Sequence, residues 1–176
     1  HTNIGVQEIN DRAKKNNISI NKISIYTIAS FALKYIQAFP ILSGYDKDKE
    51  LFENDIYNQM VTLLKNKHIK EIITNTYGEI YIDEYQDCSI NQHKLIKELC
   101  SILNYKIYGD PLQSLYDFNE PPVVFDEILR NDYELIGRLN YPWRWDKANK
   151  ELGKWILKIR ERLENNKEIT LCNVPN

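Results

Sequence analysis

The sequence has little cysteine, little glycine and no long apolar run, and each shortage narrows what the chain can be. Its 176 residues include three cysteines and six glycines. Cys88, Cys100 and Cys172 show no C-x-x-C spacing, which argues against a disulfide framework or zinc site and favours reduced thiols in the cytoplasm. No apolar stretch approaches the roughly 20 residues that cross a bilayer, so we expect no membrane partner.

Neither sign of charge dominates the chain. Lysine and arginine number 23 against 25 acidic residues, a formal net charge of −2. This balance leaves nucleic-acid binding open, because a neutral protein can still carry a local basic face. The length suits one ordinary domain with a sizeable core.

Hydrophobic spacing predicts helices that alternate with strands. The expected helices are residues 3–15, 28–36, 49–66, 90–103, 124–129 and 148–163. The expected strands are residues 23–25, 79–82, 105–108 and 133–139, and residues 39–50 are expected to form a loop. Thr27 or Ser30 is the expected cap of the second helix. Alternation of this kind indicates a mainly parallel, three-layer α/β sheet.

Polar clusters follow two of the predicted strands. D-E-Y-Q-D follows residues 79–82, and G-D-P-L-Q-S follows residues 105–108. Ligands of parallel sheets collect at the carboxyl ends of the strands, so neighbouring strands would bring both clusters to one crevice. Asp83 and Glu84 suit nucleoside triphosphate hydrolysis, the first as a Mg²⁺ ligand and the second on the attacking water. Gln113 would lie near the terminal phosphate.

These clusters resemble motifs II and III of superfamily 1 DNA helicases of the UvrD/Rep/PcrA type. Three further segments are similar to motifs of that family, in the family's order. They are "TNIGVQEINDR" (motif Ia, from Thr2), "TIASFALKYI" (the T-x-x-S-F segment, from Thr27) and "LNYPWRW" (motif IV, from Leu139). The resemblance extends from Thr2 to Leu163, nearly the whole chain.

The resemblance implies a RecA-like P-loop NTPase fold, an α/β three-layer sandwich with a mainly parallel sheet that lacks the P-loop strand. In this family the phosphate-binding loop G-x-x-x-x-G-K-[ST] lies upstream of motif Ia, and the present sequence does not contain it. We therefore expect residues 1–165 to be part of motor domain 1A, with a reduced helical insertion at about 37–75. Residues 166–176 would begin the connection to the second motor domain.

Carried over position by position, the resemblance assigns a role to individual residues. Asp83 would bind Mg²⁺, Glu84 would be the catalytic base, and Gln113 would sense the γ-phosphate of ATP. Arg144 would contact the same phosphate. The residues expected along single-stranded DNA are Thr2, Asn3, Ser30, Phe31, Tyr116 and Phe118.

The implied parent protein is an ATP-dependent, Mg²⁺-dependent DNA helicase or translocase of DNA repair, moving 3′ to 5′ on single-stranded DNA. The P-loop segment and the second motor domain would be the chain's partners within the same protein. Without them, we expect this piece alone to be inactive.

Two other hypotheses stay open. The first is a catalytically dead, helicase-derived interaction module, although the joint presence of Asp83, Glu84 and Gln113 argues against decay. The second is a Mg²⁺-dependent nuclease that uses Asp83, Glu84 and Asp110, which would leave Gln113 and Tyr116 unexplained.

Three residue types have structural interpretations as well. Gln86 and Asp87 could cap the helix that follows them rather than touch a ligand. His68 and His93 have no partners at metal-ligand spacing, so we expect both to be structural or surface residues.

Overall fold

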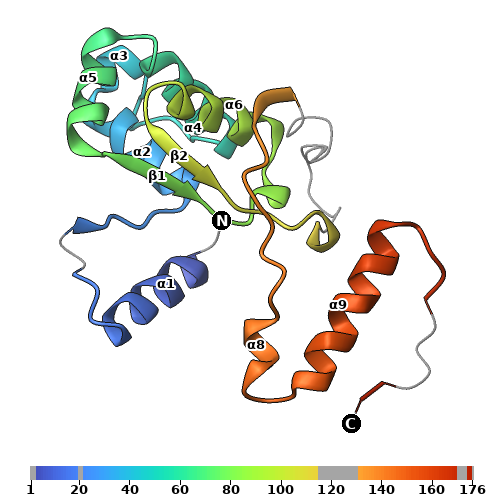
Figure 1. The fold of residues 1–176 in the computed structure, drawn as a ribbon. Coiled ribbons are helices and arrows are strands. Elements are labelled where there is room, and N and C mark those ends of the chain that lie inside the picture. The colour runs from blue at the N-terminus through green and yellow to red at the C-terminus, as the bar shows by residue number, and fades with distance from the viewer. Residues whose placement is uncertain (1–2, 20–21, 115–130, 170–173, 176) are drawn as a thin grey trace. The chain divides into compact units, whose positions relative to one another are not determined.

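The computed structural model describes residues 3–19, 22–114, 131–169 and 174–175 (Figure 1). The chain divides into two compact units, His1–Tyr133 and Glu134–Asn176. Helices occur in both units.

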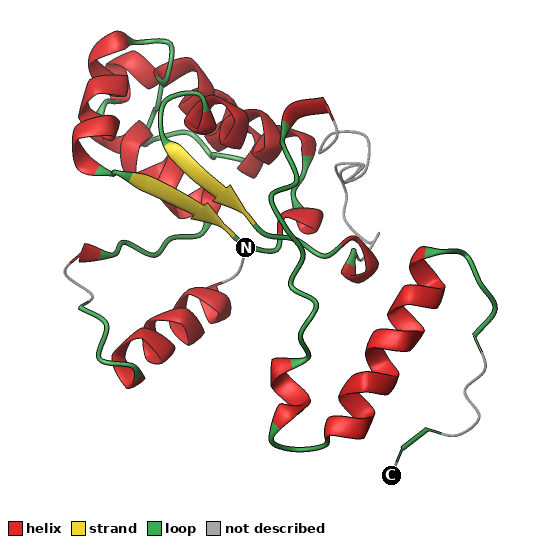
Figure 2. Cartoon of the chain, in the orientation of Figure 1, coloured by secondary structure: helices red, strands yellow, loops and turns green. Residues whose placement is uncertain are grey.

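The first unit contains most of the secondary structure. Its helices are α1 (Asn3–Lys15), α2 (Ile28–Ala38), α3 (Pro40–Ser43), α4 (Glu53–Leu63), α5 (Lys67–Thr76) and α6 (Ile90–Cys100). Its strands are β1 (Glu79–Ile82) and β2 (Asn104–Ile107), and its 3₁₀ turns are η2 (Tyr85–Asp87) and η3 (Pro111–Gln113). Figure 2 shows helices α2 to α6 gathered beside the two strands. The predicted helix 3–15 and the predicted strands 79–82 and 105–108 are thus confirmed, the last with a shift of one residue.

The two strands pair in parallel. Glu79 lies opposite Asn104, and the register continues to Ile82 opposite Ile107. Parallel neighbours need a crossover connection, and α6 supplies it between them. The carboxyl ends of both strands consequently lie at one edge of the sheet. Among the described residues the sheet has these two strands, so the structure is a mixed helix–strand fold with a small parallel sheet.

One face of β1 packs on the helices. Ile80 and Ile82 alternate with the exposed Glu79 and Tyr81, as expected of a strand covered on one side. The helices bury residues spaced by three and four positions. The main core contains Ala32, Tyr35 and Ile36 of α2, Tyr57, Met60 and Leu63 of α4, Ile69 and Ile73 of α5, and Leu95 and Leu99 of α6. Each fully buried aliphatic side chain contributes about 1.5–3 kcal/mol relative to an exposed one.

A smaller core cluster lies beneath the carboxyl ends of the strands. Tyr85, Cys88 and Ile96 are its buried members, with exposures of 0%, 0% and 2%, and Ile82 and Ile107 pack against them. The turn that leaves β1 is therefore anchored by its own buried residues.

The helix caps agree in part with expectation. Thr27 caps α2, its side chain accepting a hydrogen bond of 3.0 Å from the Ser30 backbone N–H. Ser89 caps α6, in a capping box with Gln92. The alternative in which Gln86 and Asp87 cap this helix is therefore wrong.

Three predicted elements are wrong. Residues 39–50 include a helical turn, α3, because Pro40 is suited to a first helical position and Gly44, with φ 75°, ends the turn in the left-handed conformation. Residues 23–25 and 133–139 form no strand. In the described part of the chain neither has a pairing partner, and Leu135, Ile136 and Leu139 are 73%, 82% and 89% exposed, so alternation there buries nothing.

The second unit consists of α8 (Trp143–Asp146), α9 (Lys150–Glu164) and irregular chain. The predicted helix 148–163 is confirmed within two residues at its start. Gly153 is buried against α8, where an added Cβ would lie 3.0 Å from Trp145 Cβ. The glycine thus allows the two helices to approach closely.

No helix in the described ranges is long and apolar enough to span a membrane.

Candidate functional site

Strand pairing continues past β1 and β2 into the loops that follow. The Tyr108 N–H donates to the Ile82 carbonyl at 2.8 Å, and the Tyr85 N–H donates to the Tyr108 carbonyl at 3.0 Å. These bonds hold the D-E-Y-Q-D and G-D-P-L-Q-S segments next to each other. Convergence of the two clusters at one sheet edge is thus what the structure shows.

Glu84 has an unusual backbone. Its φ of 52° and ψ of 43° are left-handed, a conformation that costs a non-glycine residue about 1–2 kcal/mol. Asp83 Oδ1 accepts a hydrogen bond of 3.0 Å from the Glu84 N–H, and both side chains are exposed. The buried Tyr85 and Gln86 follow at once and hold the turn in place. Strain of this kind is characteristic of functional sites.

Gln86 joins the two loops. Its side chain is 1% exposed, its Nε2 donates to Glu84 Oε2 at 2.6 Å, and its Oε1 accepts from the Asp110 N–H at 2.8 Å. Ser114 Oγ lies 3.5 Å from the Gln86 carbonyl oxygen, to which it donates. The second polar cluster is therefore tied to the first by a single buried residue.

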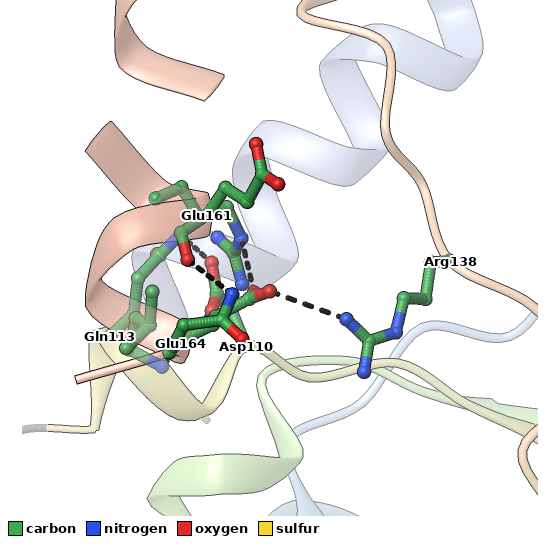
Figure 3. Close-up of polar contacts among 8 residues, drawn as sticks. Asp110, Gln113, Arg138, Glu161 and Glu164 are labelled. Atoms are coloured by element: carbon green, nitrogen blue, oxygen red, sulfur yellow. Dashed lines mark hydrogen bonds and ion pairs between the residues drawn. The ribbon is translucent and has the colours of Figure 1, made fainter. Parts of the chain in front are cut away.

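Asp110 organises the second loop. Its Oδ1 accepts from the Leu112 N–H at 3.1 Å, which caps η3, and its Oδ2 accepts from Gln113 Nε2 at 2.7 Å. Figure 3 shows this contact between Asp110 and Gln113. Gln113 is exposed, so its amide rests on the Asp110 carboxylate while it stays open to solvent.

The acidic residues of these loops allow a test of fit for Mg²⁺. Among the described residues there is no group of three or more histidine, cysteine or acidic side chains that could hold a metal ion. Mg²⁺ in nucleotide sites, however, is held by one or two carboxylates together with phosphate oxygens and water. The exposed Asp83 carboxylate fits that lesser requirement. Asp87 Oδ1 is buried and has no hydrogen-bond partner in the described part of the chain.

The other predicted site residues lie elsewhere. Arg144 is an exposed residue of α8 in the second unit. In that unit Arg138 makes an ion pair of 3.3 Å with Glu164, also drawn in Figure 3. Thr2, Tyr116 and Phe118 lie outside the described residues, and α1 begins at Asn3.

Ser30 and Phe31 lie in the first turn of α2. Ser30 is exposed and belongs to the helix cap, its Oγ donating to the Thr27 carbonyl at 3.0 Å. The half-buried Phe31 ring lies 5.9 Å from the ring of Tyr26, 5.1 Å from Tyr35 and 5.8 Å from Tyr77.

A lysine joins this aromatic group, which sequence reasoning missed. Lys34 Nζ donates to the hydroxyl of Tyr26 at 2.9 Å and of Tyr77 at 3.3 Å. The hydrogen bond from Lys34 is the main reason that the pKa of Tyr26 is lowered. The signal for Tyr26, Phe31 and Lys34 was their helical spacing, but nothing in the sequence pointed to Tyr77.

A buried polar network lies under the first loop. The Tyr85 hydroxyl is hydrogen-bonded to His93 Nδ1, and His93 Nε2 lies 3.3 Å from Asp132 Oδ2. Lys97 Nζ is 2.5 Å from the other oxygen of Asp132. Burial lowers the pKa of His93, which favours the neutral imidazole at pH 7. The structural role predicted for His93 is confirmed, and the network braces the residue that follows Glu84.

The comparison with protein families bears directly on these two loops. Residues 46–134, about half of the chain, match the UvrD/REP helicase N-terminal domain, and this range contains both loops. The chain belongs to this family. The suspected relationship to UvrD-like helicases is thereby confirmed.

Individual relatives carry names of the same kind. The chain is 31% identical to ATP-dependent DNA helicase Rep of Buchnera aphidicola subsp. Baizongia pistaciae over 117 residues, 65% of this chain and 17% of the relative. It is 28% identical to an ATP-dependent helicase/nuclease of Streptococcus uberis over 145 residues, 81% of this chain and 10% of that protein.

A third relative is RecBCD enzyme subunit RecB of Buchnera aphidicola subsp. Acyrthosiphon pisum, 29% identical over 143 residues, which are 78% of this chain and 12% of that protein. The UvrD-like chain thus spans less than a fifth of each of these relatives. No solved structure gives a significant match.

Proposed function

We propose that this UvrD-like chain is part of an ATP-dependent DNA helicase or translocase and supplies the loops that hold Mg²⁺ and activate water. The observation that carries the proposal is the convergence of the Asp83–Glu84 and Asp110–Gln113 segments at the carboxyl edge of parallel strands. That edge is where open α/β sheets bind their ligands. The names of the relatives, which include ATP-dependent helicases, support the same activity.

In this proposal each loop residue has one task. The Asp83 carboxylate would hold Mg²⁺, which when bound neutralises the charge of the ATP phosphates. Glu84 would orient the attacking water and accept its proton. Gln113 would sense the γ-phosphate, and Arg144 would contact that phosphate through its fixed charge and planar guanidinium.

Single-stranded DNA is the proposed substrate, with movement 3′ to 5′. The positions proposed to contact it are Thr2, Asn3, Ser30, Phe31, Tyr116 and Phe118. Aromatic rings suit this task because stacking on bases is sequence-tolerant. Residues 1–165 would form part of motor domain 1A, residues 37–75 its reduced helical insertion, and residues 166–176 the start of the connection. Alone, the chain would be inactive, since it would need the P-loop segment and the second motor domain.

The geometry favours this activity over a nuclease built on Asp83, Glu84 and Asp110. A nuclease of that kind would need the three carboxylates to converge on metal ions. Both Asp110 oxygens instead accept hydrogen bonds, from Leu112 and Gln113, and the described residues contain no acidic cluster of three. A dead interaction module would be distinguished by the ATPase test below.

The test is ATP hydrolysis by the whole protein, measured with and without single-stranded DNA. We expect DNA-stimulated turnover that falls about 10²- to 10⁴-fold in Glu84→Gln, the usual loss on removing a general base. Glu50→Gln, an exposed acid outside both loops, is the matched control and should turn over normally. Turnover by Glu84→Gln at the wild-type rate, or none by the wild type, would overturn the proposal.

A further inference from the structure

We infer that Gln86 is a positioning residue that holds the Glu84 carboxylate in its working orientation and fastens it to the Asp110 loop. The inference rests on the proposed function of Glu84 as the base. It assigns the task to a residue that would not touch ATP, metal or water, and that sequence reasoning treated as a possible helix cap.

The contacts of Gln86 are unusual for a glutamine. The side chain is 1% exposed, although glutamine is mostly found at protein surfaces. Its amide nitrogen is 2.6 Å from Glu84 Oε2, and its amide oxygen is 2.8 Å from the Asp110 nitrogen, in a loop 24 residues further along the chain. A buried amide is stable only when such groups are satisfied, so the contacts explain why glutamine can be buried here.

The chemistry of the two partners permits one orientation of the amide. A carboxylate accepts hydrogen bonds, and a backbone N–H donates them. The NH₂ of Gln86 must therefore face Glu84, and its carbonyl must face Asp110. A glutamate at this position would lack the donor, a lysine would lack the acceptor, and a methionine of similar size would lack both.

Glu84 needs such a partner. Its backbone is left-handed and its side chain is exposed, and within the described residues the carboxylate receives its hydrogen bond from Gln86. A bond from a neutral donor to an ionised carboxylate is stronger than one between neutral groups, so it limits the rotamers open to Glu84. Because the same amide holds Asp110, the Gln113 loop and the base would keep a fixed spacing.

A helix cap is not the explanation for Gln86. Ser89 and Gln92 already form the capping box of α6. Gln92 therefore provides a matched control: its Oε1 accepts from the Ser89 N–H at 3.0 Å and its Nε2 donates to the Tyr57 hydroxyl at 2.8 Å. It is likewise a glutamine with two bonds, six residues away, without contact to Glu84.

The first experiment is nuclear magnetic resonance on the 176-residue chain, with and without Glu84→Gln. We expect the Gln86 side-chain amide protons of the wild type to exchange slowly with solvent. In Glu84→Gln their chemical shifts should change, while those of Gln92 stay in place. Gln86 protons that exchange at the rate of an exposed glutamine, or that do not respond to Glu84→Gln, would overturn the inference whatever the protein's activity.

The second experiment is a double-mutant cycle of ATP hydrolysis by the whole protein. Gln86→Met and Gln86→Glu should each lower kcat about 10- to 100-fold, the range typical of lost positioning groups, and leave KM for ATP within about twofold. In the Glu84→Gln background the same changes should have no further effect. Gln92→Met should leave kcat unchanged, and circular dichroism would establish that each variant is folded.

The outcomes separate the two proposals. If the wild type hydrolyses ATP and Glu84→Gln does not, the proposed function holds; Gln86 variants with full kcat, or with the same loss in both backgrounds, then overturn the inference alone. If the wild type hydrolyses no ATP, the proposed function fails, and the positioning role fails with it.

Discussion

The two ends of the β1–β2 sheet treat their charges in opposite ways. At the amino end Glu79 is 3.4 Å from Lys106 on the neighbouring strand and accepts a hydrogen bond of 2.6 Å from the Tyr81 hydroxyl. At the carboxyl end Asp83 and Glu84 are hydrogen-bonded by amides, and neither has an ion pair within the described residues.

The difference indicates where a cation is wanted. A carboxylate paired with lysine is already neutralised, whereas adjacent carboxylates held only by amides repel each other until a positive charge arrives. The backbone agrees, because the left-handed Glu84 lies at the carboxyl end. The end of the sheet that folding alone leaves unbalanced is the end at which we propose Mg²⁺ and ATP bind.

Neutralising one acid at each end gives the largest expected contrast. Asp83→Asn should lower the DNA-stimulated ATPase of the whole protein at least about 10²-fold, because a bound metal contributes several kcal/mol to catalysis. Glu79→Gln, at the amino end, should leave the rate unchanged. Equal rates for the two variants in a steady-state assay would remove the distinction between the ends.

Truncating the core beneath each end should sharpen the comparison. Ile73→Ala in the main core and Ile96→Ala in the cluster around Tyr85 should each lower the free energy of unfolding by about 2–5 kcal/mol, measured by urea denaturation. In the fraction that remains folded, only Ile96→Ala should also reduce kcat, since its cluster supports the Glu84 turn. A reduction by Ile73→Ala as well would show that the ends are not independent.

The buried histidine should make stability depend on pH. Burial lowers the pKa of His93 in the folded state, so the unfolded chain binds a proton more readily. The free energy of unfolding should thus be undiminished above the unfolded pKa, about 6.5, and fall as the pH drops toward the folded pKa, by at most about 1.4 kcal/mol per unit. Asp132, Lys97 and Tyr85 face the ring.

His93→Gln should flatten that slope between about pH 6.5 and 5. Thermal denaturation of both proteins across this range checks the prediction. His68, exposed beside Glu71, offers the control: His68→Gln should leave the slope as it is in the wild type. A slope that His93→Gln does not change would contradict the burial argument.

The smallest expected effect is a gain in stability. Glu84→Gly would relieve the left-handed strain and should raise the free energy of unfolding by up to about 1 kcal/mol, while activity is lost with the base. Asn17→Gly, at φ 55°, is the control, and its gain should be smaller because asparagine tolerates this conformation better. No gain from Glu84→Gly by chemical denaturation would mean that the turn stores no strain.

Sequence reasoning was sound where local spacing decides the outcome. The helices α1 and α9, the cap at Thr27 and the strands β1 and β2 all follow from periodicity and short-range hydrogen bonding, which depend on nearby residues. It was wrong at residues 23–25 and 133–139, because alternation makes a strand only where another strand pairs with it, and in the described chain none does.

The candidate site divides in the same way. Asp83, Glu84 and Gln113 could be named from two short motifs, and the family comparison supports the resemblance on which their roles rest. The bond from Gln86 to the Asp110 loop could not be named, because it joins segments 24 residues apart. No spacing in the sequence reports a contact of that range.

By itself, the sequence determined which residues carry charge at the strand ends and which faces of the helices are apolar, since both follow from residue type and order. Only the tertiary structure decided that β1 and β2 are neighbours in parallel, that Glu84 is left-handed, and that a buried glutamine joins the two loops. The physical reason is that pairing, backbone strain and burial depend on groups that folding brings together from distant parts of the chain.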